Sequence, residues 1–178
     1  MSVMESLRAR AEPPASSPEE AGRNFRLAMR EFASSVAIVA CGEGAERNGC
    51  TATAVSALSL TPPSILVCLN LASSTLASVR RAGAFCINIL GDRHGGLADR
   101  FAGRGGFKGP ERFEDGDWVS LATGAPALAD GAAAIDCRVD EIIEKHSHAI
   151  LIGLVAAVRV GPAGPALLHW RSRYEALG

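Results

Sequence analysis

The sequence predicts a mainly β fold, a β-barrel with peripheral helices. Short apolar segments typical of strands recur along the chain at 36–41, 65–71, 85–90 and 149–155. Only two or three short stretches show the apolar periodicity of a helix. The 178 residues have the length of one domain, and 48% hydrophobic residues indicate an ordinary buried core. Strands at short spacing with so few helices are typical of an all-β architecture.

Charge and hydropathy exclude several function classes. Lys and Arg number 18 and Asp and Glu number 19, so a net charge of −1 gives no electrostatic reason to bind nucleic acid. No apolar run reaches the roughly 18 residues that a membrane span needs. The N-terminus lacks the apolar core of a signal peptide. We therefore expect a cytoplasmic protein that binds neither nucleic acid nor membrane.

The cysteines predict neither a disulfide framework nor a zinc site. They are odd in number, widely spaced and without a C-x-x-C pair. Most lie in or beside apolar segments, where a thiol behaves as a small hydrophobe. We expect reduced packing residues at Cys41, Cys50, Cys68, Cys86 and Cys137.

The N-terminal part divides into a disordered segment and the start of the domain. Residues 1–16 are polar, contain prolines and lack periodicity, so we expect disorder there and a domain over 17–178. Ser17 and Glu20 form a capping-box pattern with Pro18 at the first helical position. The apolar positions of this helix share one face, which predicts packing: Ala21, Phe25, Ala28, Met29 and Phe32.

The stretch 48–70 organises the rest of the chain. It contains two β-like segments joined at 60–63, where two prolines forbid a helix. The second segment, 65–71, is almost entirely apolar and predicts a strand buried on both faces. The first carries small hydroxylated residues, namely Thr51, Thr53, Ser56 and Ser59. Two interpretations stay open for it: the wall of a site for a planar, polar ligand, or an edge strand that faces water.

Two further motifs each have a structural and a functional interpretation. The turn 42–49 follows a strand and begins G-x-G, but Arg47 holds its sixth position and β-like sequence follows, which favours a hairpin over a dinucleotide site. A short helical pattern with a stop at Gly83, which Ser73, Ser74 or Thr75 could cap, is an ordinary capped helix. Its first N–H groups would also suit a phosphate.

The last third returns to β structure and holds the candidate imidazoles. Apolar and charged residues alternate over 135–140, as in a strand with one face in water. The glycine-rich segment 103–117 before them predicts a mobile loop. His146 and His148, if both lie on one strand, share a face, but no third metal ligand is evident and we expect no metal site. One imidazole in a ligand pocket is favoured. The chain lacks the G-x-S-x-G and H-E-x-x-H motifs, so a cofactor would carry any chemistry.

Seven sequence blocks, in this order, resemble the short-chain flavin reductase family, the reductase components of two-component flavin monooxygenases. They cover nearly everything after residue 24: FRLAMREFASSVAIVA (25–40), GCTATAVSALSLTPPSILVCLN (49–70), SSTLASVRRAGAFCINIL (73–90), LADRFAG (97–103), PALADGAAAIDCRV (126–139), HAILIGLV (148–155) and LLHWRSRYEAL (167–177).

The resemblance implies an FMN-binding split β-barrel that forms a homodimer. Such a protein transfers hydride from NADH or NADPH to FMN, or to FAD, and supplies diffusible reduced flavin to a partner monooxygenase. The alternative is a flavin- or haem-binding split-barrel carrier or sensor without turnover. A pyridoxal phosphate enzyme on the same fold is disfavoured. Such an enzyme needs a basic phosphate pocket, and the wall strand, the β-like segment with Thr51 and Thr53, carries no Arg or Lys.

The resemblance also implies site residues. The cofactor-binding residues would be Ser35, Val36, Thr51, Ala52, Thr53, Ala54 and Ser56, with Ser74 and Thr75 near the phosphate. His148 matches the histidine of the family's Gly-Asp-His block and would be the catalytic residue near the nicotinamide. His146 and Ser147 replace the Gly and Asp, which puts the pyridine-nucleotide preference in doubt. Arg171, Arg173 and Tyr174 would close the barrel or border the flavin, without an assigned role.

Overall fold

The computed structural model describes residues 17–178, which divide into two units between Phe32 and Ala33. The disorder expected at 1–16 lies outside the described residues. The first unit holds α2 (Pro18–Arg30), and the Ser17 hydroxyl accepts a hydrogen bond from the Glu20 N–H at 3.2 Å, as the capping pattern predicts. No side chain of α2 is buried by the described residues, so the predicted packing face is uncovered there.

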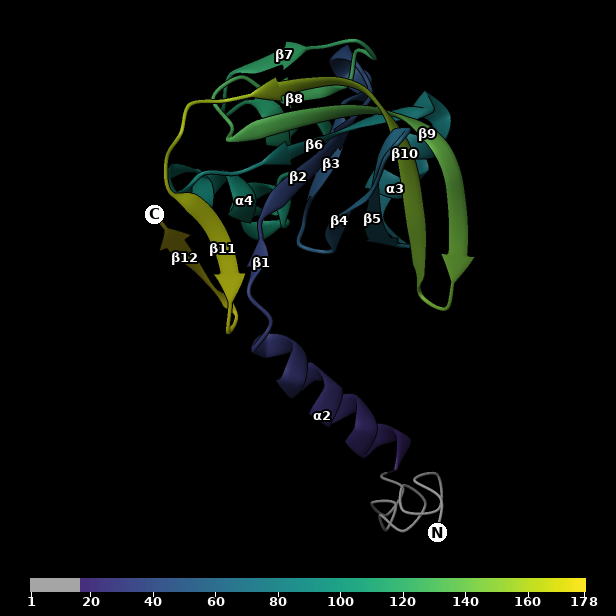
Figure 1. Ribbon diagram of the computed structural model, residues 1–178, viewed down its shortest axis with the longest axis vertical. Helices are drawn as coiled ribbons and strands as arrows, with labels where there is room; N and C mark the ends of the chain where they lie inside the picture. Colours follow the sequence, from purple (N-terminus) through teal and green to yellow (C-terminus); the bar gives the residue numbers. More distant parts are fainter. Residues whose placement is uncertain (1–16) are drawn as a thin grey trace, which may run out of the picture. The chain divides into compact units, whose positions relative to one another are not determined.

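The second unit is built on one antiparallel sheet, which confirms the mainly β prediction (Figure 1). Its seven strands follow the order β3-β2-β6-β9-β10-β5-β4. Their bounds are β2 (Ala37–Cys41), β3 (Asn48–Ala52), β4 (Val55–Leu60), β5 (Pro63–Asn70), β6 (Ala84–Ile89), β9 (Ala133–Lys145) and β10 (His148–Val160). The predicted hairpin at 42–49 joins β2 to β3, and 60–63 joins β4 to β5.

Smaller elements complete the unit. A three-stranded sheet contains β1 (Ser34–Ser35), β11 (Ala166–Trp170) and β12 (Arg173–Leu177), and a hairpin that the sequence did not predict contains β7 (Trp118–Ser120) and β8 (Pro126–Leu128). The α-helices are α3 (Ser74–Ala82) and α4 (Gly95–Phe101). Short 3-10 turns lie at η1 (Gly44–Glu46), η2 (Asp92–His94), η3 (Arg104–Gly106) and η4 (Gly109–Phe113).

The two edges of the large sheet are joined by a link of two residues, Thr53 and Ala54. Three Cα steps from Ala52 to Val55 span at most about 11 Å. A flat sheet of this size would hold its edges about 29 Å apart. The sheet must therefore curl, and the Cys68 N–H donates to the Ala54 carbonyl at 3.0 Å across the junction. The result is a split barrel, in which the single segment expected at 48–59 is two strands on opposite edges.

The core lies on both faces of β2. Ala37 and Val39 pack into one hydrophobic cluster, and Ile38 and Ala40 pack into the other, so the whole strand is buried. This explains the unbroken apolar run at 36–41. Gly49 of β3 has no side chain, which lets α4 pack closely against that strand. A Cβ at Gly49 would lie 2.8 Å from the Phe101 ring.

The segment 103–117, predicted to be a mobile loop, is held by specific contacts. The Arg100 guanidinium pairs with Glu114 at 2.9 Å and with Asp115 at 2.8 Å, and it lies 3.7 Å from the centroid of the Phe107 ring. Phe113 packs edge-on against Phe101, with ring centroids 4.9 Å apart. Phe113 thus belongs to the hydrophobic cluster that contains Ile38 and Ala40, and the loop covers that cluster. The glycine content of the loop does not reveal these contacts.

The cysteine and histidine interpretations have different outcomes. All five cysteines are free, as predicted, and burial raises the pKa values of Cys41 and Cys137 to about 12.

The pairing of His146 and His148 on one strand is wrong: β9 ends at Lys145, His146 lies in the turn with φ 54°, and His148 begins β10. Within residues 17–178 no cluster of three potential metal ligands occurs, and no helix there is long and apolar enough to cross a membrane.

Asn88, the one polar residue of β6, is fully buried and ties β8 to the barrel. Its amide donates to the Pro126 carbonyl at 3.1 Å and accepts from the Leu128 N–H at 2.7 Å. We expect Asn88→Leu to lower the free energy of unfolding by about 2–4 kcal/mol. The substitution leaves the Pro126 carbonyl and the Leu128 N–H buried without a hydrogen-bond partner. Urea denaturation measures this, with the exposed Ser120→Ala as a control that should change stability by less than about 0.5 kcal/mol. Equal effects of the two substitutions would contradict the role given to Asn88.

Candidate functional site

A cavity of about 410 Å³ lies against the end of β3, within the size range of small-molecule sites. We call it the wall pocket. Its lining comes from β3 and the link after it, from the end of α4 and from the C-terminal hairpin: Thr51, Ala52, Thr53, Ala102, Arg104, His169, Ser172, Arg173 and Tyr174.

Local contacts hold the pocket walls in place. β3 is an edge strand, so the backbone groups on its outer side have no strand partner. The Thr51 hydroxyl donates to the Ala98 carbonyl at 2.5 Å and so ties β3 to α4. The Val36 N–H donates to the Leu167 carbonyl at 3.0 Å, which fixes the C-terminal hairpin beside the barrel. In that hairpin His169 and Tyr174 are a cross-strand pair.

The lining combines small apolar groups with polar groups at the rim. Ala52 and Ala102 are small enough to let a flat ligand approach the backbone. The guanidinium groups of Arg104 and Arg173 supply donors and positive charge. Burial and the neighbouring Asp99 carboxylate raise the pKa of Tyr174, so this residue is a neutral phenol at physiological pH. Such a set of groups suits a planar ligand with polar edges and some negative charge.

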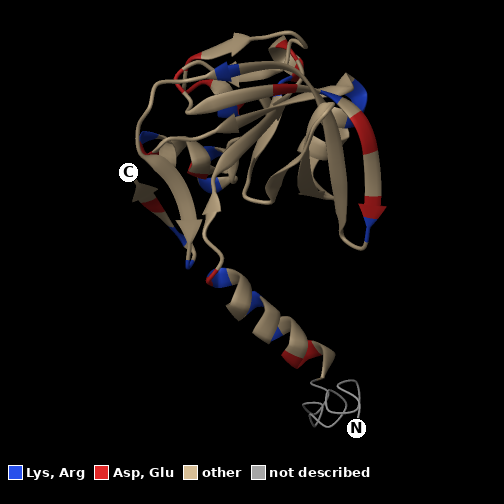
Figure 2. Cartoon of the chain, viewed as in Figure 1, with Lys and Arg blue, Asp and Glu red and all other residues tan. Residues whose placement is uncertain are grey.

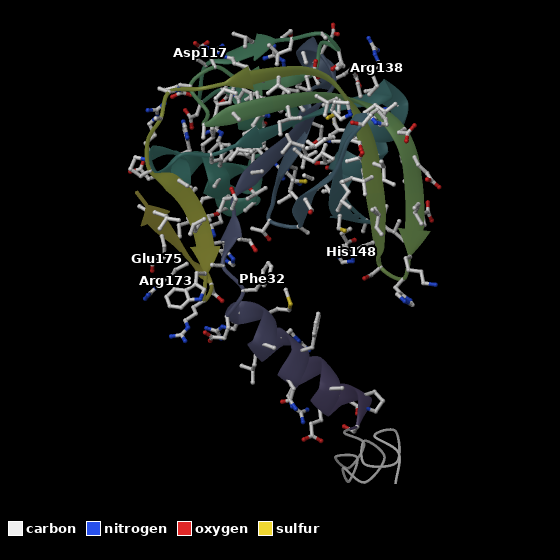
Figure 3. The ribbon with its side chains drawn as sticks, viewed as in Figure 1. Phe32, Asp117, Arg138, His148, Arg173 and Glu175 are labelled. Atoms are coloured by element: carbon white, nitrogen blue, oxygen red, sulfur yellow. The ribbon has the colours of Figure 1, made fainter. Side chains whose placement is uncertain are left out.

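A second group of predicted residues lies at another place in the barrel. His148 pairs with Asn70 at the end of β5, and the Leu71 N–H donates to the Ser147 carbonyl at 2.9 Å. The chain then enters α3, whose cap is the Ser73 hydroxyl. His148 and Ser74 thus share one end of the sheet, and Figure 3 shows His148 beside the β9–β10 turn, well separated from Arg173 on the C-terminal hairpin.

The remaining predicted residues occupy distinct environments. The Val36 side chain is fully buried in the core, and the Thr75 hydroxyl is buried beneath α3, 3.5 Å from the Asn48 amide oxygen. Ser35 is exposed and pairs with Leu168, and Ser56 lies exposed on β4. Of the predicted wall, the structure brings Thr51, Ala52 and Thr53 to the pocket, and the Ala54 carbonyl is taken by Cys68.

Several pocket residues were missed by the sequence reasoning. Arg104 stands in a glycine-rich loop and His169 in an apolar tail, and neither carries a motif. Arg173 and Tyr174 were noted without a role. Basic groups therefore reach the wall from other elements, although the wall strand itself has none. Spacing in the sequence gives no signal for this, because the residues meet only when the barrel forms.

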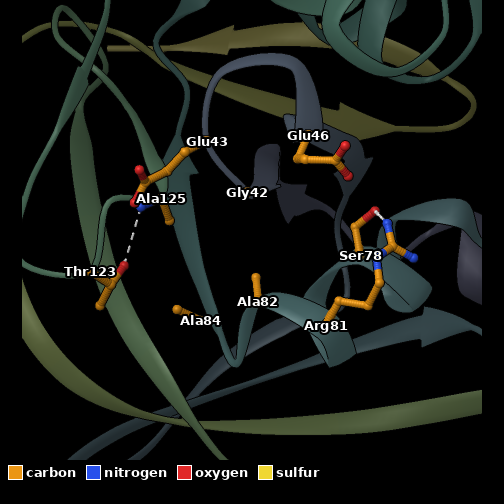
Figure 4. Close-up of a pocket in the computed structure, with 9 residues that line it drawn as sticks. All are labelled: Gly42, Glu43, Glu46, Ser78, Arg81, Ala82, Ala84, Thr123 and Ala125. Atoms are coloured by element: carbon orange, nitrogen blue, oxygen red, sulfur yellow. Dashed lines mark hydrogen bonds between the residues drawn. The ribbon is translucent and has the colours of Figure 1, made fainter.

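A larger cavity, of about 460 Å³, lies elsewhere in the barrel and contains none of the predicted residues (Figure 4). Arg81 and Ser78 of α3 form one side of it, where the Arg81 guanidinium donates to the Ser78 hydroxyl at 3.0 Å. Glu43 and Glu46, from the β2–β3 turn, stand on the other sides. Its charged side chains are exposed, and it does not touch the wall segment.

The fold defines a split-barrel protein, and its wall pocket suits a flat, polar-edged ligand. Comparisons with known proteins show the family. The family model "Flavin reductase like domain" matches residues 29–178. The chain is 38% identical over 165 residues to "FMN reductase (NADH) RutF 2" of Rhizobium rhizogenes, with 93% of this chain and 94% of that protein covered.

Solved structures give the same result. BorF, the flavin reductase component of a bacterial two-component tryptophan halogenase, superposes with a TM-score of 0.81 at 26% identity, covering 88% of this chain and 98% of that one. The styrene monooxygenase flavin reductase of Pseudomonas putida S12 gives 0.76 at 26% identity, with 87% and 97% covered. The chain belongs to the flavin reductase like family.

The residues of the wall pocket fit a flavin. The tricyclic ring is flat, carries carbonyl and N–H groups along one edge, and gains negative charge on reduction. The alanines give room for the ring plane, and the two guanidinium groups and the phenol match a polar edge. The first N–H groups of α3, beside the Ser73 cap, suit a phosphate.

We expect Thr51→Val to weaken FMN binding about fivefold, because the substitution removes the hydrogen bond that holds the wall strand on α4. Thr51→Ser keeps the hydroxyl and should bind FMN as the wild type does. Quenching of flavin fluorescence on titration gives the dissociation constants. Equal affinity for all three proteins would exclude Thr51 from the site.

Proposed function

We propose that this chain is an NADH-dependent FMN reductase that releases reduced flavin to a partner oxygenase. The observation that supports this most is the wall pocket, in which the predicted strand segment 51–53 faces guanidinium and phenol groups suited to a flavin. Membership in the flavin reductase like family supports the same activity. The overall reaction converts NADH, FMN and a proton into NAD⁺ and FMNH₂.

The chain's own residues bind and orient the reactants. A bound flavin supplies the acceptor for the hydride of the nicotinamide. Thr51, Ala52 and Thr53 would hold the ring by their backbone, and the α3 N-terminus would take the phosphate through its free N–H groups. Such positioning is the main contribution open to this site, since orientation alone is worth roughly 7–11 kcal/mol. His148 would contact the nicotinamide.

The names of the relatives support the finer assignments. The curated relative is named for FMN and NADH, which favours these over FAD and NADPH. One structural neighbour is named as the flavin reductase component of a two-component tryptophan halogenase, and the other as the flavin reductase of styrene monooxygenase. We therefore propose that a separate oxygenase uses the reduced flavin that this chain releases. In the described part of the chain, the cartoon in Figure 2 shows residues of both charge signs distributed over many elements.

The test of this function is NADH oxidation by the purified chain under air, followed by absorbance with and without FMN. Multiple turnovers that depend on FMN are expected, with lower rates for FAD or NADPH. Stoichiometric bound flavin that NADH does not reduce would instead favour the carrier or sensor alternative.

We expect His148→Ala to lower kcat at saturating NADH about tenfold while the FMN dissociation constant changes less than about twofold, as for a group that contacts the nicotinamide and contributes to the transition state. His146→Asn is the matched control, because His146 lies in the adjacent turn with φ 54° and asparagine tolerates that conformation. The control should retain the wild-type rate. An unchanged kcat in His148→Ala would remove this residue from the reaction.

We also infer that the chain is a homodimer. Large apolar side chains remain exposed on the edge strand β4 and on β10, where Leu60 is 87% and Val160 is 79% exposed. Homodimer interfaces are more apolar than the rest of a protein surface, so these side chains suit one. Sedimentation should give a dimer, and Leu60→Lys should shift it toward monomer. A stable wild-type monomer would contradict the inference.

A further inference from the structure

Asp99 stands behind the wall pocket and contacts two of its lining residues. It lies on α4, one residue after Ala98, whose carbonyl binds Thr51. Its carboxylate pairs with the Arg104 guanidinium, at 3.0 Å from Nη1 to Oδ1 and 3.1 Å to Oδ2. The same carboxylate interacts with the Tyr174 hydroxyl. One side chain outside the pocket thus connects a donor and a phenol that line it.

The environment of Asp99 strengthens its hold on Arg104. Its Oδ1 atom is inaccessible to solvent and has no hydrogen bond of good geometry. A buried carboxylate oxygen is costly unless a charge balances it. The guanidinium of Arg104 is the group that does so, although most of its own side chain is exposed. Without Asp99, an exposed arginine in a glycine-rich loop would sample many rotamers.

Tyr174 lies between two elements, α4 and β11. Its ring lies against the start of α4, where a Cβ added to Gly95 would be 3.8 Å from Cδ2. The His169 ring lies across the hairpin with its centroid 6.1 Å away. Burial and the Asp99 carboxylate, which lies on the same helix as Gly95, raise the pKa of the hydroxyl. Since a carboxylate can only accept, a phenol that donates to Asp99 would keep its oxygen lone pairs for a ligand.

We propose that Asp99 is a positioning residue of the flavin site, which presents Arg104 as a donor and Tyr174 as an acceptor to the imide edge of the flavin ring. That edge carries an N–H between two carbonyl groups, so a donor beside an acceptor complements it. The inference rests on the proposed function, because it takes the wall pocket as the place of the ring. No sequence motif indicates it, since Asp99 and Tyr174 are 75 residues apart by their numbers.

Tyr174 is the only tyrosine of the chain, so the near-ultraviolet absorbance of tyrosinate reports on it alone. The groups that affect this titration are burial and Asp99, which raise its pKa, and Arg104, which lowers it. His169 and Arg173 are the other titratable groups of the pocket wall. Asp99→Asn should lower the pKa of Tyr174, and Arg104→Gln should raise it. A side chain that only stabilises the fold would not produce shifts of opposite sign.

Flavin binding gives the second readout. Asp99→Asn should weaken FMN binding roughly five- to tenfold, as expected for one charge-assisted contact at a partly exposed site. Asp140→Asn, an exposed aspartate on β9 outside the pocket, makes the same charge change and should leave both readouts as in the wild type.

A flavin analogue tests the acceptor role directly. N3-methyl FMN lacks the imide N–H, so the wild type should bind it at least about tenfold more weakly than FMN. Tyr174→Phe should lose most of this discrimination, and Asp99→Asn should lose part of it. The losses in the double variant Asp99→Asn/Tyr174→Phe should be less than additive, because Asp99 acts through Tyr174.

Three results would overturn the proposal: an unchanged Tyr174 titration in Asp99→Asn, equal binding of FMN and its N3-methyl analogue, or strictly additive losses. If Asp99→Asn does not fold by circular dichroism, Arg104→Gln carries the test, because most of that side chain is exposed. Failure of the proposed function is distinguishable, since it would remove NADH turnover in the wild type while the Tyr174 titrations would still report on Asp99.

Discussion

The structure depends on the short link between the two edges of the sheet. Thr53 and Ala54 carry the chain from β3, paired with β2, to β4, paired with β5. Two residues cannot bridge a flat sheet of seven strands, so the sheet has to curl until its edges meet. This closure brings the small-residue segment 51–54 to a place where its backbone is open to a ligand. Bulky side chains there would fill that space.

The walls of the site come from segments that this closure leaves uncovered. The end of α4 and the C-terminal hairpin lie beside the edge strand β3, held by hydrogen bonds from Thr51 to Ala98 and from Val36 to Leu167. The pocket thus contains a backbone wall from one part of the chain and charged groups from two others. The curled sheet positions the wall, and the peripheral elements supply its charged groups.

The histidines and the loop show why some sequence interpretations failed. The positions of His146 and His148 suggest one strand, but the β9–β10 turn falls between them and sends them to different conformations. The segment 103–117 has the composition of a mobile loop, yet Arg100 binds its acidic residues and Phe113 enters the core. Both outcomes depend on partners distant along the chain, which periodicity and composition do not encode.

The sequence by itself determined the local features of this protein. Apolar runs marked the strands, Ser17 and Pro18 marked a helix start, and the stretch 51–59 stood out for its small hydroxylated residues. Only the tertiary structure decided that β3 and β4 form opposite edges, and that Arg104, Tyr174 and Asp99 meet beside that wall. The physical reason is that local patterns follow from backbone geometry and burial along a few residues. The site follows from how the sheet curls and which side chains its closure brings together.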